Sequence, residues 1–338
     1  MSTFDPISGA PISSSTDEPT VSAAGLTSGV AGFNATRDQI IRQAALHIGV
    51  ISAGVTMNAQ MLSDFAHNLN GMIKRWQAQQ LHVWTVREGV LFPAPGQIKY
   101  GAGGGVTDNL TEFFVSTSMS AAAVVGATVL DIDDPSDILD GDNIGILLDN
   151  GTLQWSVASS VTSTTVTIAD ALTDSAAAGN NVFAYTERLL RPLKVVSARR
   201  FDIISETEVP VTVMARRDYH DLVMKTGAGS INQMFYDPQL TTGFFYLWRV
   251  PAATTELLRF TWHRPIMDFA VGGNYPDLPQ EWVQTIEFNL AAVMASQFAI
   301  PDNRFNRIVA LAAQFLDELR GFDHEAEAID FQPDMEGR

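Results

Sequence analysis

Hydrophobic residues recur with helical spacing in two segments near the start of the chain. The first follows Thr36 and Gln39, which are placed to form a capping box, and Gly49 supplies a stop. The second follows Thr56, which can cap it, and carries a single apolar stripe. The apolar positions are Ile40, Ile41, Ala44 and Ile48 in the first segment, then Leu62, Phe65, Leu69, Met72, Ile73 and Trp76 in the second. Because each stripe must be buried against a partner, the pattern predicts a helix hairpin.

From Val83 the hydrophobic period shortens to that of extended strands. A short helix is expected over residues 216–224, and two closing helices over residues 279–299 and 303–320, the last ended by Gly321. We therefore expect an α+β fold, an antiparallel helix bundle with β elements.

Residues 101–186 have a composition of their own. They contain no Lys or Arg, and short hydrophobic runs alternate with turns, of which Asp149-Asn150-Gly151 is the clearest hairpin signal. Their acidic residues are Asp108, Glu112, Asp131, Asp133, Asp134, Asp137, Asp140, Asp142, Asp149, Asp170 and Asp174. The segment is predicted to be a small antiparallel β-barrel or sandwich inserted into the helical chain.

The whole chain then divides into several parts. Residues 1–35 are rich in Ser, Thr, Ala, Gly and Pro and are expected to form a flexible arm. The other parts are residues 36–100, the helix hairpin and first strands; 101–186, the inserted acidic domain; 187–322, strands and the closing helix pair packing on residues 36–100; and 323–338, an acidic tail. Two folding units with flexible ends agree with a length of 338 residues.

Charge and cysteine content narrow the classes of function. The formal net charge is −17, with 38 acidic and 21 basic side chains, so a DNA-binding surface is not expected, and any DNA nearby is expected to pass without being gripped. The absence of cysteine excludes disulfides, thiolate metal sites and a cysteine nucleophile, and it fits assembly in a reducing cytoplasm. No secretion signal and no apolar run of about 18 residues is found, so a soluble protein without a membrane partner is expected.

No catalytic constellation stands out in the sequence. The six histidines are scattered without the spacing of metal ligands. The acidic run from Asp131 to Asp137 resembles a calcium loop only loosely, because the required glycine and the closing glutamate are missing. The sequence thus predicts a protein that is not an enzyme and holds no metal or cofactor.

One basic group is a candidate interaction surface. Its members are Arg188, Arg191, Arg199, Arg200, Arg216 and Arg217. These arginines either balance nearby acids on the surface of the same chain or meet an acidic face of the next copy. The planar guanidinium is suited to the second role because it can bind a carboxylate through two hydrogen bonds.

The C-terminal end is a second candidate. After Gly321, acidic residues are interleaved with a few large apolar residues, namely Phe322, Ile329, Phe331 and Met335. Such a mixture cannot form a core of its own, but it suits a segment that folds on a partner. The alternative is a solvated chain end.

Several short motifs, taken in order, resemble those of podovirus-type phage head-to-tail adaptors, also called tail tubular or packaged-DNA-stabilisation proteins. The motifs are Ile40-Ile41-Arg42-Gln43-Ala44-Ala45, Asn68-Leu69-Asn70-Gly71-Met72-Ile73-Lys74-Arg75-Trp76, Gly141-Asp142-Asn143-Ile144-Gly145-Ile146, Gly151-Thr152-Leu153-Gln154-Trp155, Phe235-Tyr236-Asp237-Pro238, Leu247-Trp248-Arg249-Val250-Pro251 and Asp277-Leu278-Pro279. They cover roughly residues 36–322, and since each is short, their order carries the resemblance. The arm at residues 1–35 and the stretch after Gly321 lie outside it.

The resemblance implies a dodecameric ring of identical copies bound beneath the portal protein of the virion. Such a ring retains packaged DNA in a channel without sequence-specific binding and offers a platform for tail nozzle or tail fibre proteins. The resemblance implies no catalytic residue. It also implies that the C-terminal segment docks on the portal, and that the protein is assembled in the host cytoplasm.

Two alternatives stay open. One is a tail-tube or nozzle subunit. The other is a carbohydrate-binding module that would use Trp155 and Tyr185 of the insertion, although both stand in apolar strand contexts that favour a core position.

Overall fold

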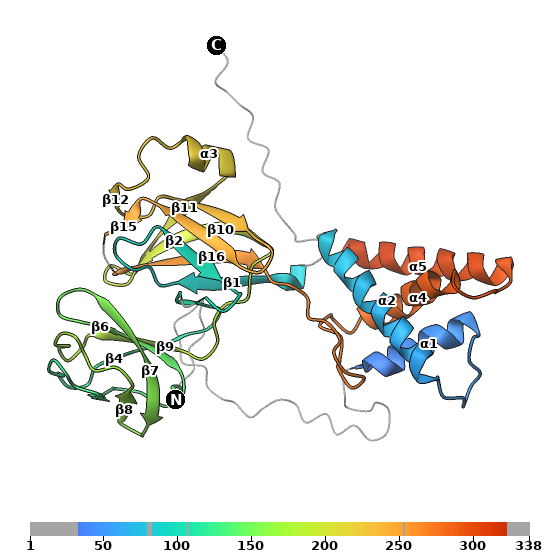
Figure 1. Cartoon of the computed structure of the whole chain (residues 1–338), viewed down its shortest axis with the longest axis horizontal. Helices are drawn as coiled ribbons and strands as arrows, with labels where there is room; N and C mark the ends of the chain where they lie inside the picture. Colours follow the sequence, from blue (N-terminus) through green and yellow to red (C-terminus); the bar gives the residue numbers. More distant parts are fainter. Residues whose placement is uncertain (1–32, 80–82, 107, 253, 323–338) are drawn as a thin grey trace, which may run out of the picture.

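Helices from the two ends of the chain pack together, and the strands between them form a separate part of the molecule (Figure 1). The structure, a computed structural model, describes residues 33–79, 83–106, 108–252 and 254–322. Within these residues it contains five α-helices and sixteen strands. The expected mixture of helices and strands is therefore confirmed, with the strands predominating.

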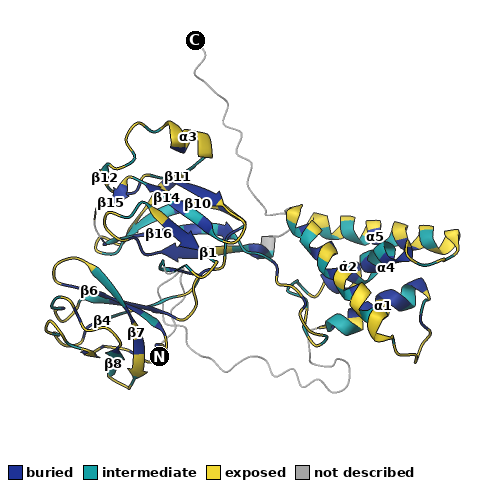
Figure 2. Cartoon of the chain, viewed as in Figure 1, coloured by how far each residue is buried: buried dark blue, intermediate teal, exposed yellow. Residues whose placement is uncertain are grey.

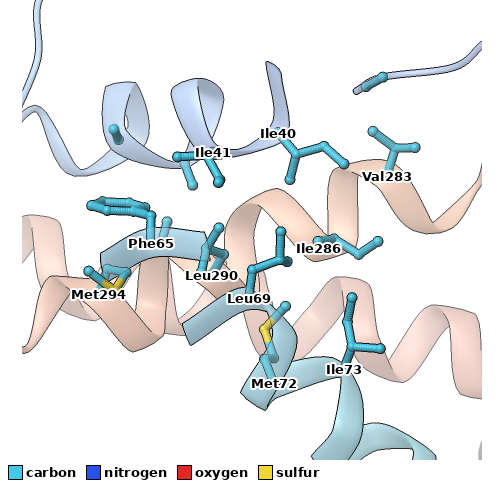
Figure 3. Packing of buried hydrophobic residues seen from close by; sticks show 14 of the residues in the cluster. Ile40, Ile41, Phe65, Leu69, Met72, Ile73, Val283, Ile286, Leu290 and Met294 are labelled. Carbon is cyan, nitrogen blue, oxygen red and sulfur yellow. The ribbon is translucent and has the colours of Figure 1, made fainter. Parts of the chain in front are cut away.

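Four of the helices share one hydrophobic core. They are α1 (Arg37–Ile48), α2 (Ala59–Ala78), α4 (Trp282–Ala295) and α5 (Asp302–Phe322). Figure 3 shows Ile40 and Leu69 from the start of the chain meeting Ile286 and Leu290 from its end, and all four side chains are fully buried. The chain must therefore return to its beginning before either helix pair can bury its apolar stripe.

The helix ends follow local chemistry, with some differences from expectation. The capping box of Thr36 and Gln39 is confirmed, and Gly49 ends α1 in the left-handed conformation at φ 82°. The cap of α2 is Asn58 and not Thr56, and its side-chain oxygen accepts a hydrogen bond from Met61 N at 2.7 Å. α5 continues through Gly321, the expected stop.

The larger sheet is antiparallel except where β11 and β13 run parallel. Its strands, in spatial order, are β2 (Lys99–Ala102), β14 (Gly243–Trp248), β13 (Gln233–Pro238), β11 (Thr207–Met214), β10 (Lys194–Asp202), β16 (Glu256–His263), β1 (Val86–Leu91) and β3 (Leu110–Thr111). Tyr100, Phe245, Phe260 and Trp262 fill its core. Figure 2 shows much of β16 in the colour of buried residues. The 3-10 helix η1 (Val83–Thr85) precedes it, and α3 (Arg216–Asp221) and the pair β12 (Ala228–Gly229) and β15 (Val250–Pro251) lie at its margin.

The acidic segment forms a second, six-stranded antiparallel sheet with a core of its own. Its strands, in spatial order, are β4 (Val115–Ser118), β9 (Asn181–Tyr185), β6 (Asn143–Leu147), β7 (Leu153–Val161), β8 (Thr165–Ile168) and β5 (Val129–Asp131). Backbone hydrogen bonds of 3.0 Å from Ser120 to Asp131 and from Asp133 to Ser118 join its two edges. The sheet is thus nearly closed and barrel-like, and the hairpin expected at Asp149-Asn150-Gly151 connects β6 and β7.

The insertion leaves and re-enters the larger sheet at one place. Thr111 Oγ1 donates to the carbonyl of Glu187 at 2.9 Å, and Leu189 N donates to the carbonyl of Leu110 at 2.8 Å. The sequence-based boundary at residue 101 lies inside β2, because β2 and β3 pair with the larger sheet before the barrel-like sheet begins at Val115.

An ion pair holds the segment that leads from the larger sheet back to the helices. Arg264, directly after β16, donates to Asp277 through Nη2 at 2.7 Å, and Nη1 contacts the other carboxylate oxygen. The backbone N of Met267 donates to the same carboxylate at 3.0 Å. Burial raises the pKa of Asp277, but the bonds from Arg264 and Met267 outweigh it and hold this pKa below its ordinary value.

Asp277→Asn should therefore destabilise the protein in a pH-dependent way. A depressed pKa in the folded state contributes stability above the unfolded pKa of about 3.9, and this stability is lost as the pH falls through the lower folded value. At pH 7 we expect the free energy of unfolding to fall by about 1–3 kcal/mol, and the difference from the wild type to shrink in acid. Urea titrations across pH measure it.

Asp268→Asn is the matched control, because Asp268 forms a pair with Lys74 but its side chain is 59% exposed. Its effect at pH 7 should stay below about 1 kcal/mol. Equal losses in the two variants would mean that the Arg264–Asp277 pair has no special role.

Removal of residues 113–186 should leave the helical core folded. The adjacency of Thr111 and Glu187 lets a short glycine linker close the gap without moving β3. Circular dichroism of this deletion is expected to retain the helical signal, while the sheet loses stability because Phe92 and Leu257 lose their cover. Collapse of the helical signal would show that the insertion is not separable.

Candidate functional site

The six candidate arginines lie on one strand, one helix and one connecting segment. Arg199 and Arg200 belong to β10, Arg216 and Arg217 begin α3, and the pair at residues 188 and 191 follows β9. They do not come from one continuous strand or helix, so the sequence cluster is not a single structural element.

Four of these arginines contact carboxylates of their own chain. The pairs are Arg199 with Glu88 and Glu208, Arg200 with Glu256, Arg216 with Asp237, and Arg217 with Asp221. The Arg200 and Arg217 pairs are loose, at 3.7 Å, and Arg217 is 90% exposed. Internal charge balance, one of the two expected roles, is therefore present, and contact with another copy stays a prediction.

Arg188 lies where the barrel-like sheet joins the larger sheet. Its Nη2 donates to Asn143 Oδ1 at 2.9 Å, and its side chain lines a cavity of about 350 Å³ with Glu112, Glu187 and Trp262. Arg191 packs beside Gly103. Carboxylates and guanidinium groups share this cavity, so it is not a uniformly basic site.

Cations and aromatic rings gather on the outer face of β2, β13 and β14, beside α3. Along β14 the exposed-side residues Phe244, Tyr246 and Trp248 alternate with core residues, and Lys99 Nζ lies 3.7 Å from the Phe244 ring centroid. The other cation and ring pairs on this face are Lys99 with Tyr246, Arg216 with Phe235, Lys225 with Tyr219, and Arg249 with Trp248. We call these nine residues the cation–aromatic surface.

Sequence reasoning missed most of this surface. Of its cations only Arg216 was a candidate, because Lys99, Lys225 and Arg249 stand singly in distant segments and meet only through strand pairing. A signal was available in part: Lys99-Tyr100 lies in a strand, and Trp248-Arg249 lies at the end of one, and each places a cation beside an aromatic residue. Nothing in the sequence pattern specified the register that brings them together.

Trp155 and Tyr185 belong to an aromatic junction between the two sheets. Both rings contact Phe92 of the segment after β1, with centroids 5.0 and 6.5 Å away. Trp155 lies over Gly145 of the paired strand, where a Cβ atom would come within 2.9 Å of the indole. Tyr185 is 2% exposed, its hydroxyl donates to Asn109 at 2.7 Å, and burial raises its pKa. The carbohydrate alternative thus lacks the exposed ring pair that it requires.

The C-terminal candidates are at the edge of the described chain. Phe322 is the last residue of α5, and Ile329, Phe331 and Met335 lie outside the described residues, as does most of the expected N-terminal arm. Docking through these residues stays a prediction.

Neither a metal centre nor a membrane span is found in the described residues. No group of three or more His, Asp or Glu side chains is placed there to hold a metal ion. No helix in this part of the chain combines the length and apolarity needed to cross a bilayer.

No protein-family model matches the chain, and no curated protein matches it. The resemblance to head-to-tail adaptors therefore stands on the motifs and their order alone.

Trp155→Ala should weaken the junction between the sheets. Loss of its contacts with Phe92 and Tyr185 is expected to cost about 2–4 kcal/mol of unfolding free energy. Phe113→Ala is the control, because Phe113 lies at the same junction but is 75% exposed. Thermal and urea unfolding measure both. A Trp155 variant of unchanged stability that loses binding to a glycan array would favour the carbohydrate alternative.

Proposed function

We propose that this chain is a structural head-to-tail adaptor of a tailed phage, one subunit of a dodecameric ring beneath the portal. In this proposal it is not an enzyme and holds no cofactor. Its four helices act as an antiparallel bundle, its barrel-like sheet is an inserted domain, and the ring retains packaged DNA and carries the tail platform.

The nested order of the elements carries the proposal. Helices α1 and α2 open the chain, the larger sheet follows, the acidic sheet interrupts it, and α4 and α5 return to the first helices. This is the order in which the motifs resembling the adaptor family occur. Since each motif is short, their agreement with one connected architecture supports the proposal more than any single match does.

The shape of the chain suits a subunit that contacts different layers of an assembly. The helical core and the β part lie side by side and are joined by the segments around β1 and Arg264 (Figure 1). Each part has its own hydrophobic core, so each can present its own surface. In this proposal the helical part and the C-terminal segment bind the portal. The β part binds the tail nozzle or fibre proteins.

The charge of the chain fits a channel that DNA must traverse. With a net charge of −17, the ring would oppose tight binding of the phosphate backbone. DNA would then slide through without sequence-specific contacts. The proposed location is the head-to-tail junction of the virion, after assembly in the host cytoplasm.

Mass measurement of the full chain, alone and mixed with the portal ring of the same genome, tests this function. A ring that forms alone or on the portal is expected. Helical or tubular polymers without portal binding would favour the tail-tube or nozzle alternative. A monomer under both conditions would contradict the adaptor.

Truncation after Arg320 should abolish portal binding while the chain stays folded. The removed segment contains Phe322, Ile329, Phe331 and Met335, the apolar residues expected to fill grooves of the portal. Co-sedimentation with portal rings measures binding, and circular dichroism checks the helices. A control with serine at these four positions keeps the length and charge of the tail. Binding at undiminished affinity in both variants would remove the tail from the interface.

A further inference from the structure

The cation–aromatic surface concentrates most of the cation–ring contacts of the described chain. Five of the six pairs found there belong to it, and the sixth joins Arg259 to Phe201. A cation held over the face of an aromatic ring keeps its charge, and the ring fixes the position of the charged group. In a chain with 38 acidic and 21 basic side chains, such a gathering of cations on one face is unusual.

Solvent-exposed apolar side chains lie next to these cations. Val223 is fully exposed and Met224 is 66% exposed, in the loop that follows α3. The loop is fixed to the sheet because Trp248 Nε1 donates to the carbonyl of Met224 at 2.8 Å. Figure 2 likewise shows α3 as exposed. The surface thus offers positive charge and apolar area together, which is the composition of a protein-binding site.

A complementary segment exists at the far side of the same chain. The stretch from Val129 to Asp140, which includes the loop after β5, exposes five carboxylates, those of Asp131, Asp133, Asp134, Asp137 and Asp140. Two apolar residues of this stretch, Val129 and Leu139, are 55% and 58% exposed. No Lys or Arg occurs between residues 101 and 186 to neutralise it. We call this stretch the acidic loop.

We propose that the cation–aromatic surface of one copy binds the acidic loop of a neighbouring copy. The contact cannot close within one chain, because α3 lies on one side of the larger sheet and the barrel-like sheet on the other (Figure 1). Two different complementary surfaces on one subunit produce a head-to-tail contact, which closes into a ring when the rotation allows it. This inference rests on the proposed ring function and specifies how its subunits meet.

Nucleic acid is the competing occupant of this surface. Duplex DNA presents a continuous row of phosphates, but Asp218, Asp221 and Asp237 interrupt the cations of this surface, and Arg216 is already paired with Asp237, so the cations suit a few separate carboxylates better. The exposed Val223 and Met224 have no use against a phosphate backbone, but they match Val129 and Leu139. Charge and apolarity together therefore favour a protein partner that is acidic and partly apolar.

Crosslinking between singly labelled chains tests the contact directly. Because the sequence has no cysteine, Met224→Cys in one preparation and Leu139→Cys in another give one thiol each. Their mixture, treated with a short bismaleimide under conditions where rings form, should yield crosslinked dimers. Val309→Cys, on α5 and 40% exposed, replaces either partner as the control and should yield none. Equal crosslinking of the control would overturn the assignment.

Charge reversal supplies the second readout. Lys99→Glu with Arg249→Glu should raise the dissociation constant for self-association at least about tenfold. Adding Asp131→Lys and Asp137→Lys to the same chain should restore assembly, because the new lysines of the acidic loop can then pair with the new glutamates of the cation–aromatic surface. Arg42→Glu with Arg307→Glu, on exposed positions of α1 and α5, lowers the net charge by the same amount and should leave the dissociation constant for self-association without the portal unchanged.

The possible outcomes distinguish a failure of the proposed contact from a failure of the proposed ring function. Undiminished assembly of the Lys99 and Arg249 double variant leaves the adaptor intact and overturns the contact. A variant that assembles normally but loses binding to duplex DNA assigns the surface to nucleic acid and also overturns it. A wild-type chain that stays monomeric with and without the portal contradicts both proposals.

Discussion

The helical core built from both ends of the chain is the constraint on which the rest of the structure depends. α1 and α2 present apolar stripes that they cannot bury against each other alone, and α4 and α5 cover what remains. The chain between Ala78 and Trp282 therefore leaves the helical core after α2 and returns to it at α4. The Arg264–Asp277 pair and the bond from Lys74 Nζ to the carbonyl of Ile266, 2.7 Å long, fix the point of return.

The same principle of nesting is repeated inside the β part. The larger sheet is interrupted by the barrel-like sheet, whose entry and exit are joined at Thr111 and Glu187. Rings on one strand cover glycines on the next: Phe260 lies over Gly89, as Trp155 does over Gly145. A side chain at either glycine would push the ring away, so these positions let bulky aromatic residues pack close to a neighbouring strand.

Local signals in the sequence predicted the elements better than their meeting points. The capping box at Thr36, the Gly49 stop and the hairpin at Asp149-Asn150-Gly151 depend on neighbouring residues, and all three were predictable. The choice of Asn58 over Thr56 as a cap was not, because both are good capping residues and only helix packing decides between them. The cation–aromatic surface as a whole could not be predicted from the sequence either, because it depends on the register of β2, β13 and β14.

Carboxylates are stabilised in two different ways in the two sheets. In the larger sheet, Glu88, Glu208 and Glu256 face arginines of the same sheet. The barrel-like sheet has no cation, and its carboxylates bind hydroxyl and backbone donors instead.

Hydrogen bonds from Ser136 lower the pKa of Asp134, and those from Ser175, Ala177 and Asn180 lower the pKa of Asp149. Such bonds order the loops without cancelling their charge. Of the eleven acidic side chains between residues 101 and 186, Glu112 alone forms an ion pair in the described part of the chain, with Arg87, whereas the arginines of β10 are largely engaged with their own neighbours. Because the acidic sheet needs no internal counter-charge to hold its shape, its negative surface remains available to cations outside the chain, whether mobile ions or those of a protein.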